Sequence, residues 1–185
     1  MITVGILTIS DKGARGERKD ESGPEIERLV SELPARVEVY EVVPDEKDII
    51  IDKLIDYIDN KRLDLIITTG GTGVAPRDIT PDATMSVIDK EVPGMAEAMR
   101  LEGLKKTPHA MISRAVVGIR KSSLIVNLPG SPKAVYENLS AIVPSIPHTI
   151  AKIKGDSSEC VSLSSVATGN PTAKAKSTER KGTYA

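Results

Sequence analysis

The sequence has no phenylalanine and no tryptophan, and its four aromatic residues are the tyrosines Tyr40, Tyr57, Tyr136 and Tyr184. This scarcity excludes the stacking platforms with which single-strand nucleic-acid binders hold bases. A surplus of positive charge is also missing, since 25 lysines and arginines face 26 aspartates and glutamates. Dedicated nucleic-acid binders normally carry a basic excess. We therefore expect no nucleic-acid partner and a core of aliphatic side chains.

Cysteine, histidine and long apolar runs are scarce as well. The single cysteine, Cys160, cannot form an intramolecular disulfide, and it has no nearby histidine to make it a catalytic thiol. His109 and His148 stand far apart without further ligands at metal-binding spacing, which argues against zinc. No apolar stretch approaches the ~20 residues that span a bilayer, and no signal peptide is evident. We expect a single-domain cytoplasmic protein without a membrane partner.

The spacing of apolar residues predicts alternating strands and helices. Ile2–Ile9 and Leu63–Thr69 are apolar on both faces, as buried parallel strands are, and Arg36–Val43 alternates like an outer strand. The runs Ala115–Ile119 and Leu124–Leu128 are so close in sequence that they predict a hairpin. The fold class is therefore α/β, with three layers (α/β/α) around a mostly parallel sheet that contains one antiparallel strand.

Helical spacing fills the segments between these strands. Ser22 and Glu25 have the form of a capping box at the start of a helix that ends before Pro34. A second amphipathic helix is predicted over Glu46–Asn60, and Thr80 followed by proline predicts an N-cap. Further helices are expected over Met95–Lys105, Ser131–Val143 and Pro144–Lys154.

The composition changes after Gly155, where serine and threonine become frequent and apolar residues rare. Such a segment has too little apolar surface to offset its loss of conformational entropy on ordering. We predict one domain over residues 1–155 and a Ser/Thr-rich tail over residues 156–185 that is mostly extended or disordered.

A glycine-rich turn, Thr68–Gly73 (TTGGTG), directly follows a predicted strand. Ligands of open α/β sheets bind beyond the carboxyl ends of the strands. Glycines there let backbone N–H groups gather around phosphate oxygens, because no Cβ blocks the approach. The turn lacks the Gly-Lys-Ser/Thr ending of a P-loop and is not G-x-G-x-x-G, so a purely structural turn is the alternative.

Two carboxylates are expected beside this turn. Asp45 follows Val43-Pro44 at the end of the strand Arg36–Val43, and Asp78 lies in the loop after the glycines. Mg²⁺ prefers one or two carboxylates together with substrate phosphates and water. The alternatives are that Asp45 caps the following helix and that Asp78 closes an Asx-turn.

A third candidate is Asn127–Lys133, where a strand ends at a Pro-Gly turn and Ser131 can cap the next helix. The N-terminus of that helix would attract an anion, and Lys133 in its first turn would suit a ligand phosphate or remain solvated. The loop Lys12–Glu21 mixes both signs of charge. It is interpreted as a solvated loop, with a lid over an anionic substrate as the alternative.

These features, in this order, resemble the molybdopterin adenylyltransferase family of molybdenum cofactor biosynthesis, which is similar to the gephyrin G domain. The resemblance covers Ile2 to about Gly155. The matching segments are Ile9-Ser10-Asp11, Val43-Pro44-Asp45-Glu46, Thr68–Gly73, Arg77–Thr84, Pro93-Gly94-Met95 with Glu97 and Arg100, Ser113-Arg114, and Asn127–Lys133.

The resemblance implies a homotrimer that transfers AMP from ATP to the terminal phosphate of molybdopterin with Mg²⁺, releasing pyrophosphate. It also implies a partner enzyme that inserts the metal. Asp45 and Asp78 match the catalytic aspartates and are the candidate Mg²⁺ ligands, while Thr72 and Ser113 match residues that hold the pterin. The predicted substrate-binding residues are Ser10, Thr69, Gly70, Gly71, Thr72, Gly73, Ser113, Asn127, Pro129, Gly130, Ser131 and Lys133.

Two other functions remain open at this point. A trimeric scaffold of the same fold would bind molybdopterin without catalysis, and a related enzyme would transfer a nucleotidyl or phosphoryl group to another acceptor. The intact carboxylates and glycine turn favour catalysis. Because the chain has so few aromatic rings, we expect a polar, glycine-lined pocket rather than an aromatic cage around pterin or adenine.

Overall fold

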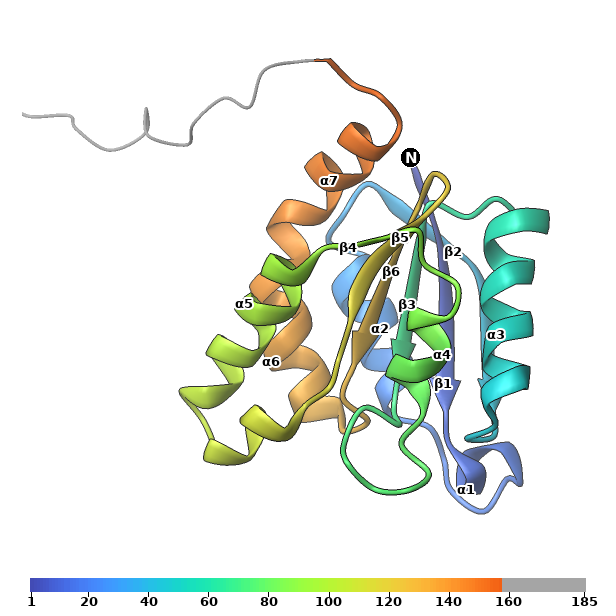
Figure 1. The fold of residues 1–185 in the computed structure, drawn as a ribbon, viewed down its shortest axis with the longest axis vertical. Coiled ribbons are helices and arrows are strands. Elements are labelled where there is room, and N and C mark those ends of the chain that lie inside the picture. Colours follow the sequence, from blue (N-terminus) through green and yellow to red (C-terminus); the bar gives the residue numbers. More distant parts are fainter. Residues whose placement is uncertain (158–185) are drawn as a thin grey trace, which may run out of the picture.

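The computed structural model describes residues 1–157, and within them six strands form one sheet in the order β2-β1-β3-β6-β5-β4 (Figure 1). The strands are β1 (Ile2–Ile9), β2 (Ala35–Val43), β3 (Leu65–Thr69), β4 (Lys90–Glu91), β5 (Val117–Arg120) and β6 (Ser123–Leu128). Strands β2, β1, β3 and β6 are parallel, while β5 runs antiparallel to both of its neighbours. The predicted mostly parallel sheet with one antiparallel strand in a hairpin is confirmed.

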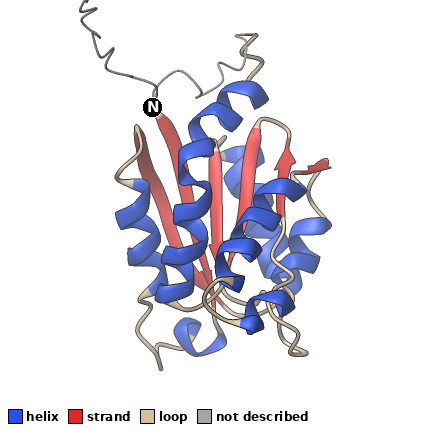
Figure 2. Cartoon of the chain, turned by 90° about the vertical axis from the view of Figure 1, so that its left-hand side faces the viewer, coloured by secondary structure: helices blue, strands red, loops and turns tan. Residues whose placement is uncertain are grey.

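Helices cover both faces of this sheet, as Figures 1 and 2 show. They are α1 (Asp11–Ala14), α2 (Ser22–Val30), α3 (Lys47–Ile55), α4 (Thr80–Met85), α5 (Pro93–Leu104), α6 (Pro132–Ile142) and α7 (Ile146–Ile153). Helices α2, α5, α6 and α7 pack on one face, and α3 and α4 pack on the other. The three-layer α/β/α architecture is confirmed, and no helix of residues 1–157 has the length and apolar character to cross a membrane.

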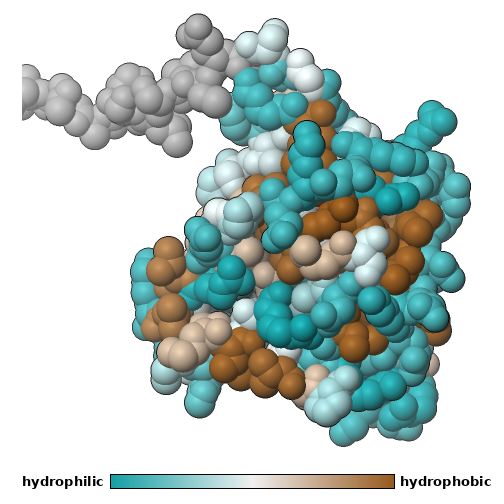
Figure 3. Space-filling view, viewed as in Figure 1, coloured by the Kyte–Doolittle hydropathy of each residue, from teal (hydrophilic) through white to brown (hydrophobic). Residues whose placement is uncertain are grey.

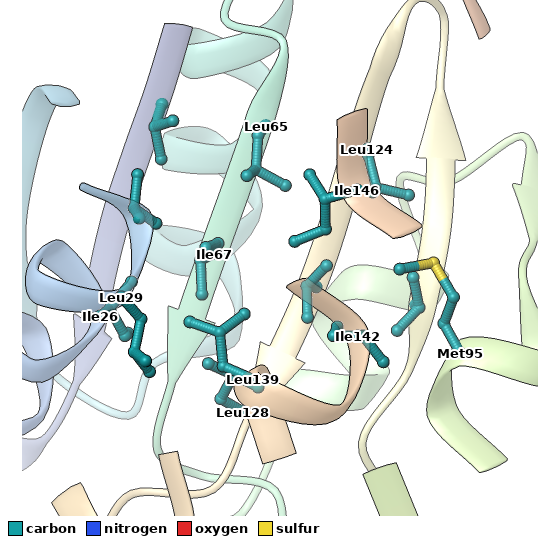
Figure 4. Packing of buried hydrophobic residues seen from close by; sticks show 14 of the residues in the cluster. Ile26, Leu29, Leu65, Ile67, Met95, Leu124, Leu128, Leu139, Ile142 and Ile146 are labelled. Atoms are coloured by element: carbon teal, nitrogen blue, oxygen red, sulfur yellow. The ribbon is translucent and has the colours of Figure 1, made fainter. Parts of the chain in front are cut away.

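The core is aliphatic and follows the period of two that a β-strand imposes. In β3, Leu65 and Ile67 point into the cluster beneath α2, α5, α6 and α7, whereas Ile66 points into the cluster beneath α3 and α4. Figure 4 shows the first cluster, where Leu139 of α6 approaches Leu128 and Ile67 of the sheet. Both faces of the strand are buried, which explains why its sequence is continuously apolar.

Several short elements were absent from the sequence prediction. Helix α1 lies in the segment that had been predicted as a polar loop, and β4 is a two-residue edge strand. The helix predicted over Glu46–Asn60 is α-helical only to Ile55 and ends in one π-helical turn, Asp56–Asn60. Short 3-10 turns also occur at Pro108–Ile112 and Val143–Ser145.

Two predicted helix caps are wrong. Ser22 is not the N-cap of α2, because its hydroxyl donates to the carbonyl of Gly130 at 2.8 Å. The N–H groups of Ser22 and Gly23, in the first turn of α2, instead donate to Asp20 Oδ1 at 2.8 and 3.2 Å. Thr80 is likewise the first residue of α4, and its hydroxyl donates to the carbonyl of Gly70 at 2.9 Å. In both cases the hydroxyl bonds to the carbonyl of a residue outside the helix rather than to an N–H group in the first turn of its own helix.

The domain boundary near Gly155 stays a prediction. Helix α7 ends at Ile153, and Gly155 follows it with a φ of +89°. Most of the predicted tail, including Cys160 and Tyr184, lies outside the described residues.

Candidate functional site

The glycine turn and the Pro-Gly turn lie side by side because β3 and β6 are paired in register, with Thr69 opposite Leu128. Just beyond the strands, Gly70 N–H donates to Leu128 O at 3.1 Å, and the Thr69 hydroxyl donates to Pro129 O at 2.7 Å. Two turns that are 60 residues apart in sequence thus form one surface at the carboxyl ends of the strands. The sequence predicted a site at this end of the sheet.

Only glycine fits two positions of the first turn. Gly70 has a φ of +100° and Gly71 a φ of +60°. A Cβ on Gly70 would lie 2.2 Å from the carbonyl oxygen of Ile9, and one on Gly71 would lie 2.5 Å from the Thr80 hydroxyl. The turn is therefore a structural requirement, as the alternative interpretation held, and it also lines a cleft.

Two clefts flank these turns. The first, which we call the strand-end cleft, has a volume of about 330 Å³ and is lined by Thr8, Ile9, Ser10, Gly13, Arg18, Lys19, Asp20, Glu21, Ser22, Asp45, Thr69, Gly70, Gly71, Gly130, Ser131 and Pro132. The second, the helix cleft, has about 250 Å³ and is lined by Thr72, Gly73, Arg100, Gly103, Thr107, His109, Ala110, Ile112, Ser113, Pro129, Ala134, Glu137 and Asn138. No tyrosine of residues 1–157 lines either one.

The structure divides the predicted site residues into three groups. Those in the strand-end cleft are Ser10, Asp45, Thr69, Gly70, Gly71, Gly130 and Ser131. Those in the helix cleft are Thr72, Gly73, Ser113 and Pro129. Asp78, Asn127 and Lys133 line neither cleft, and Lys133 lies instead in a shallow groove with Tyr136. Ser131 caps α6 as predicted, accepting from Ala134 N–H at 3.3 Å.

Asp45 is held by Asp11 through two reciprocal hydrogen bonds. Asp45 Oδ2 accepts from Asp11 N–H at 2.8 Å, and Asp11 Oδ1 accepts from Asp45 N–H at 3.1 Å. Asp45 does not cap α3, whose N-cap residue is Glu46. Its other oxygen, Oδ1, is directed at Gly71, because a Cβ on that glycine would lie 3.2 Å from it. The carboxylate therefore faces the glycine turn.

The two neighbouring aspartates have opposite pKa shifts. Arg77 binds Asp11 with both Nε and Nη2, at 3.0 and 2.8 Å, which lowers the pKa of Asp11. Burial raises the pKa of Asp45, and the nearby negative charges of Asp11 and Asp78 raise it further. No lysine or arginine side chain of residues 1–157 forms an ion pair with Asp45 or Asp78, so both carboxylates are available to a cation.

The raised pKa of Asp45 predicts that Asp45→Asn stabilises the fold at pH 7. The folded state binds the Asp45 proton more tightly than the unfolded chain, so stability is lost as the pH rises through the pKa of the folded state. The amide removes this unfavourable charge and keeps an oxygen for the Asp11 N–H. Urea unfolding should show a higher midpoint for the variant at pH 7, and the gain should vanish below about pH 4. An equal or lower midpoint at pH 7 contradicts this.

Asp78 lies at the end of its own small turn. Its Oδ2 accepts from the N–H of Ala75, three residues earlier, at 2.8 Å. This bond closes the loop, but it is not the Asx-turn offered as an alternative, which would use the N–H two residues further on. A Cβ on Gly73 would lie 2.7 Å from the same oxygen, so the carboxylate packs directly against the glycine turn. Asp78 thus adjoins Gly73 of the helix cleft although it lines neither cleft.

Arg114 connects the glycine turn to the loop of Asp78. Its Nε donates to Gly73 O at 2.8 Å, and its Nη2 donates to the carbonyl of Asp78. Asp82 holds the guanidinium from the other side, at 2.8 Å. The backbone N–H of Arg114 also donates to Thr72 O at 2.8 Å, so one residue positions both loops.

Asn127, a predicted substrate-binding residue, is fully buried and bonded within the protein. Its Nδ2 donates to the hydroxyls of Thr68 and Thr84, both at 2.9 Å, and its Oδ1 accepts from Val116 N–H at 3.3 Å. The side chain cross-links β3, α4 and the segment before β5 beneath the turns. The structure gives it a supporting position rather than one at the surface of a cleft.

We expect Asn127→Leu to destabilise the protein by about 2–4 kcal/mol, because leucine leaves buried polar partners unsatisfied. The free energy of unfolding in urea measures this loss. Asn60→Leu, at an exposed asparagine bonded only to Asp56, is the control and should stay within about 0.5 kcal/mol of the parent. Equal stability of the two variants would contradict the assignment.

Sequence reasoning missed residues whose role depends on distant partners. Arg77 and Arg114 belong to matching motifs, but their partners lie 66 and 41 residues away in sequence. Arg100, His109 and Glu137 enter the helix cleft from separate elements, and no sequence pattern groups them. Asp20 could have been found, because aspartates near the start of a helix commonly accept from its first N–H groups, as Asp20 Oδ1 does from Ser22 and Gly23.

A mostly parallel sheet covered by helices on both faces, with a glycine turn and a cleft at the carboxyl ends of its strands, defines the class: a three-layer α/β protein whose candidate ligand site lies at the strand ends. Residues 5–148 match the family described as the probable molybdopterin binding domain of molybdenum cofactor biosynthesis. The chain belongs to this family.

Individual relatives agree with the family match. The chain is 46% identical over 157 residues to the molybdopterin adenylyltransferase of Helicobacter pylori, covering 84% of this chain and 89% of that protein. It is also 46% identical over 156 residues to the molybdenum cofactor synthesis protein cinnamon of Drosophila melanogaster, covering 84% of this chain but 26% of the longer protein. The crystal structure of the molybdopterin biosynthesis enzyme MoaB from Thermus thermophilus superposes with a TM-score of 0.80 at 52% identity, over 84% of this chain and 98% of that one.

Proposed function

We propose that the protein is a molybdopterin adenylyltransferase, which transfers AMP from ATP to the terminal phosphate of molybdopterin with release of pyrophosphate. One observation carries this proposal. The glycine turn is flanked by Asp45 and Asp78, two carboxylates without ion-pair partners in residues 1–157, in a chain 46% identical to a named molybdopterin adenylyltransferase. A phosphate-binding turn beside such carboxylates suits phosphoryl chemistry.

The two clefts suit the two substrates. We assign ATP to the strand-end cleft, where the backbone N–H groups of Gly71 and Gly130 form no hydrogen bond within residues 1–157. We assign the pterin to the helix cleft with Thr72 and Ser113. The clefts meet at the glycine turn and at the Pro129-Gly130 turn. The reacting phosphates of both substrates would therefore meet there, which supports a direct transfer.

Positioning is the main task of the protein in this reaction. A phosphate oxygen of molybdopterin attacks the α-phosphorus of ATP, and the bond to the β-phosphate oxygen breaks, so pyrophosphate leaves. The attacking group is already anionic, so no general base is required. The backbone N–H groups of the glycine turn orient the phosphates, and Arg114 keeps that turn in place against the loop of Asp78.

Mg²⁺ fits the residues present. Within residues 1–157 no three Asp, Glu, His or Cys side chains gather as a complete metal cage. A pair of carboxylates that still needs phosphate and water ligands is the arrangement Mg²⁺ prefers. Asp45 and Asp78 would hold the ion, and when bound it would supply positive charge that favours the departure of pyrophosphate.

We also propose a homotrimer that passes its product to a partner enzyme for metal insertion. Figure 3 shows apolar side chains gathered over α5 and the turn that follows it, at the lower left of the molecule. The exposed members there are Leu101, Leu104, Met111 and Ile112. An apolar patch on a protein surface marks an interaction site. Analytical ultracentrifugation should give three times the chain mass, and a monomer contradicts the trimer.

The decisive experiment incubates the protein with α-labelled ATP, Mg²⁺ and molybdopterin. Labelled adenylyl-molybdopterin and unlabelled pyrophosphate are the expected products. Tight pterin binding without labelled product would instead establish the non-catalytic scaffold. Label on a different acceptor would establish another transferase.

A further inference from the structure

Two cations of the loop between β1 and α2 line the strand-end cleft without a partner. Arg18 and Lys19 are exposed, belong to the lining of this cleft, and form no ion pair or hydrogen bond with any residue of the described chain. Arg15 in the same loop differs, because its Nε binds Glu17 at 2.7 Å and it lies outside the cleft. The unpaired charges are thus the ones that face the proposed nucleotide site.

Asp20 anchors this loop directly after the two cations. Its Oδ2 accepts from the hydroxyls of Thr8, on β1, and Tyr40, on β2, each at 2.5 Å. Its Oδ1 accepts from the N–H groups of Ser22 and Gly23 at the start of α2. Burial raises the pKa of Asp20, but these four donors outweigh it and lower the pKa overall. Asp20 is therefore an ionised carboxylate at neutral pH, and its oxygens are already bound by these four donors of the protein.

The loop is held at its other end too, and it is joined to the second turn of the site. Ser10 caps α1 by accepting from Gly13 N–H at 3.1 Å. Ser22 follows the anchor and donates to Gly130 O at 2.8 Å, on the Pro-Gly turn of the same cleft. Arg18 and Lys19 consequently stand between two fixed points, at the wall of the cleft that contains Gly70 and Gly71.

We propose that Arg18 and Lys19 form the binding site for the β- and γ-phosphates of the nucleotide, and for the pyrophosphate they become, with Asp20 as the residue that positions them. This deepens the nucleotide site and rests on the proposed function. A triphosphate carries more negative charge than the α-phosphate alone, and arginine and lysine are the side chains that bind such groups through charge-assisted hydrogen bonds. Asp45 and Asp78 are anionic and cannot contact those phosphates without a cation, so the site needs other positive groups.

The test compares ATP and AMP binding in the full chain by isothermal titration calorimetry with Mg²⁺. The double variant Arg18→Gln, Lys19→Gln should weaken ATP and pyrophosphate binding by roughly 10–100-fold, the range expected for two exposed charge-assisted contacts. AMP binding should change by less than about 2-fold, because AMP has no β- or γ-phosphate. The matched control Lys12→Gln, Arg15→Gln removes the same charge from the same loop outside the cleft and should leave both affinities unchanged.

Other outcomes overturn the assignment. Equal loss of ATP and AMP affinity in the double variant means a general effect of charge or folding. An unchanged ATP affinity means that the two cations stay solvated. An equal loss of ATP affinity in the control variant means that any two positive charges of this loop have the same effect, whether or not they line the cleft. Asp20→Asn gives a second measurement: it should weaken ATP binding more than AMP binding while circular dichroism stays that of the parent, and unchanged ATP binding contradicts the positioning role.

The two proposals can fail separately. ATP binding that depends on Arg18 and Lys19, together with no adenylyl-molybdopterin formed by the parent protein, would leave the phosphate site in place and remove the transferase. Normal AMP transfer by the parent protein, together with unaltered ATP binding by the double variant, would support the transferase and contradict the phosphate site at Arg18 and Lys19.

Discussion

Asp78→Asn is expected to abolish AMP transfer, a loss of at least roughly 10²–10³-fold, the size seen when one preorganised electrostatic group is removed. The reason is the lost charge rather than a lost fold. An amide oxygen can still accept the Ala75 N–H that now reaches Asp78 Oδ2 at 2.8 Å, so the loop keeps its closure against Gly73. Pterin binding should remain largely intact, because the helix cleft does not include Asp78.

The measurement is single-turnover formation of adenylyl-molybdopterin, combined with pterin binding by titration. Asp48→Asn is the matched control, since Asp48 is an exposed aspartate of α3 outside both clefts, and it should keep full activity. Magnesium provides a second readout: Mg²⁺ should improve ATP binding by the parent protein but much less by the Asp78 variant. Ordinary turnover by Asp78→Asn would remove this residue from the mechanism.

Gly70→Ala is expected to have the largest effect on stability, a loss of more than about 4 kcal/mol or failure to fold. Two penalties add. The φ of +100° is a conformation that only glycine adopts readily, and the new Cβ would lie 2.2 Å from the carbonyl oxygen of Ile9. That oxygen belongs to the backbone at the end of β1, a strand paired on both sides, so it cannot move aside as a flexible side chain would.

The unfolding midpoint in urea, or soluble yield where the variant does not fold, measures this effect. Gly94→Ala is the control, because a Cβ there meets nothing within 4 Å and Gly94 lies in α5 with an ordinary φ. Its stability should be unchanged or raised by up to about 1 kcal/mol, as expected for alanine in a helix. A Gly70→Ala protein with the parent's midpoint would show that the turn tolerates a side chain.

The sequence was sufficient to predict the fold because burial in this protein follows the period of the strands. Leu65, Ile66 and Ile67 are apolar in succession since helices cover both faces of the sheet, and the hairpin follows from the short gap between two apolar runs. The π-helical turn at Asp56–Asn60 and the two-residue strand β4 leave no comparable periodic signal. Such elements depend on packing against the rest of the fold.

The site was predicted less completely, and the reason is the distance between partners. Asp45 and the glycine turn were found because each directly follows a strand, so the sheet brings them together. Asn127, near the end of β6, and Lys133, in the first turn of α6, lie close to the same strand end in sequence. Yet the Asn127 side chain is buried, and Lys133 lines a different groove from the strand-end cleft. A sequence position at a strand end does not determine the direction of the side chain.

The two incorrect helix caps have the same cause. The local patterns at Ser22 and Thr80 fit common caps, but both hydroxyls bond across the fold, to Gly130 O and Gly70 O. Each carbonyl belongs to one of the two turns of the site. The capping patterns therefore marked the correct positions but not their role, which is to hold those turns.

Asp64 lies at the end of the sheet opposite the clefts and joins the two ends of the domain. It accepts from Thr3 N–H at 3.1 Å, near the start of β1, and binds Lys154 Nζ at 2.6 Å, just after α7. Figure 1 shows the N-terminus and the end of α7 at the top, away from the strand ends where the turns lie. A chain extension at either end of the described domain therefore starts on the side opposite the clefts, and in cinnamon the matching region makes up 26% of a longer protein.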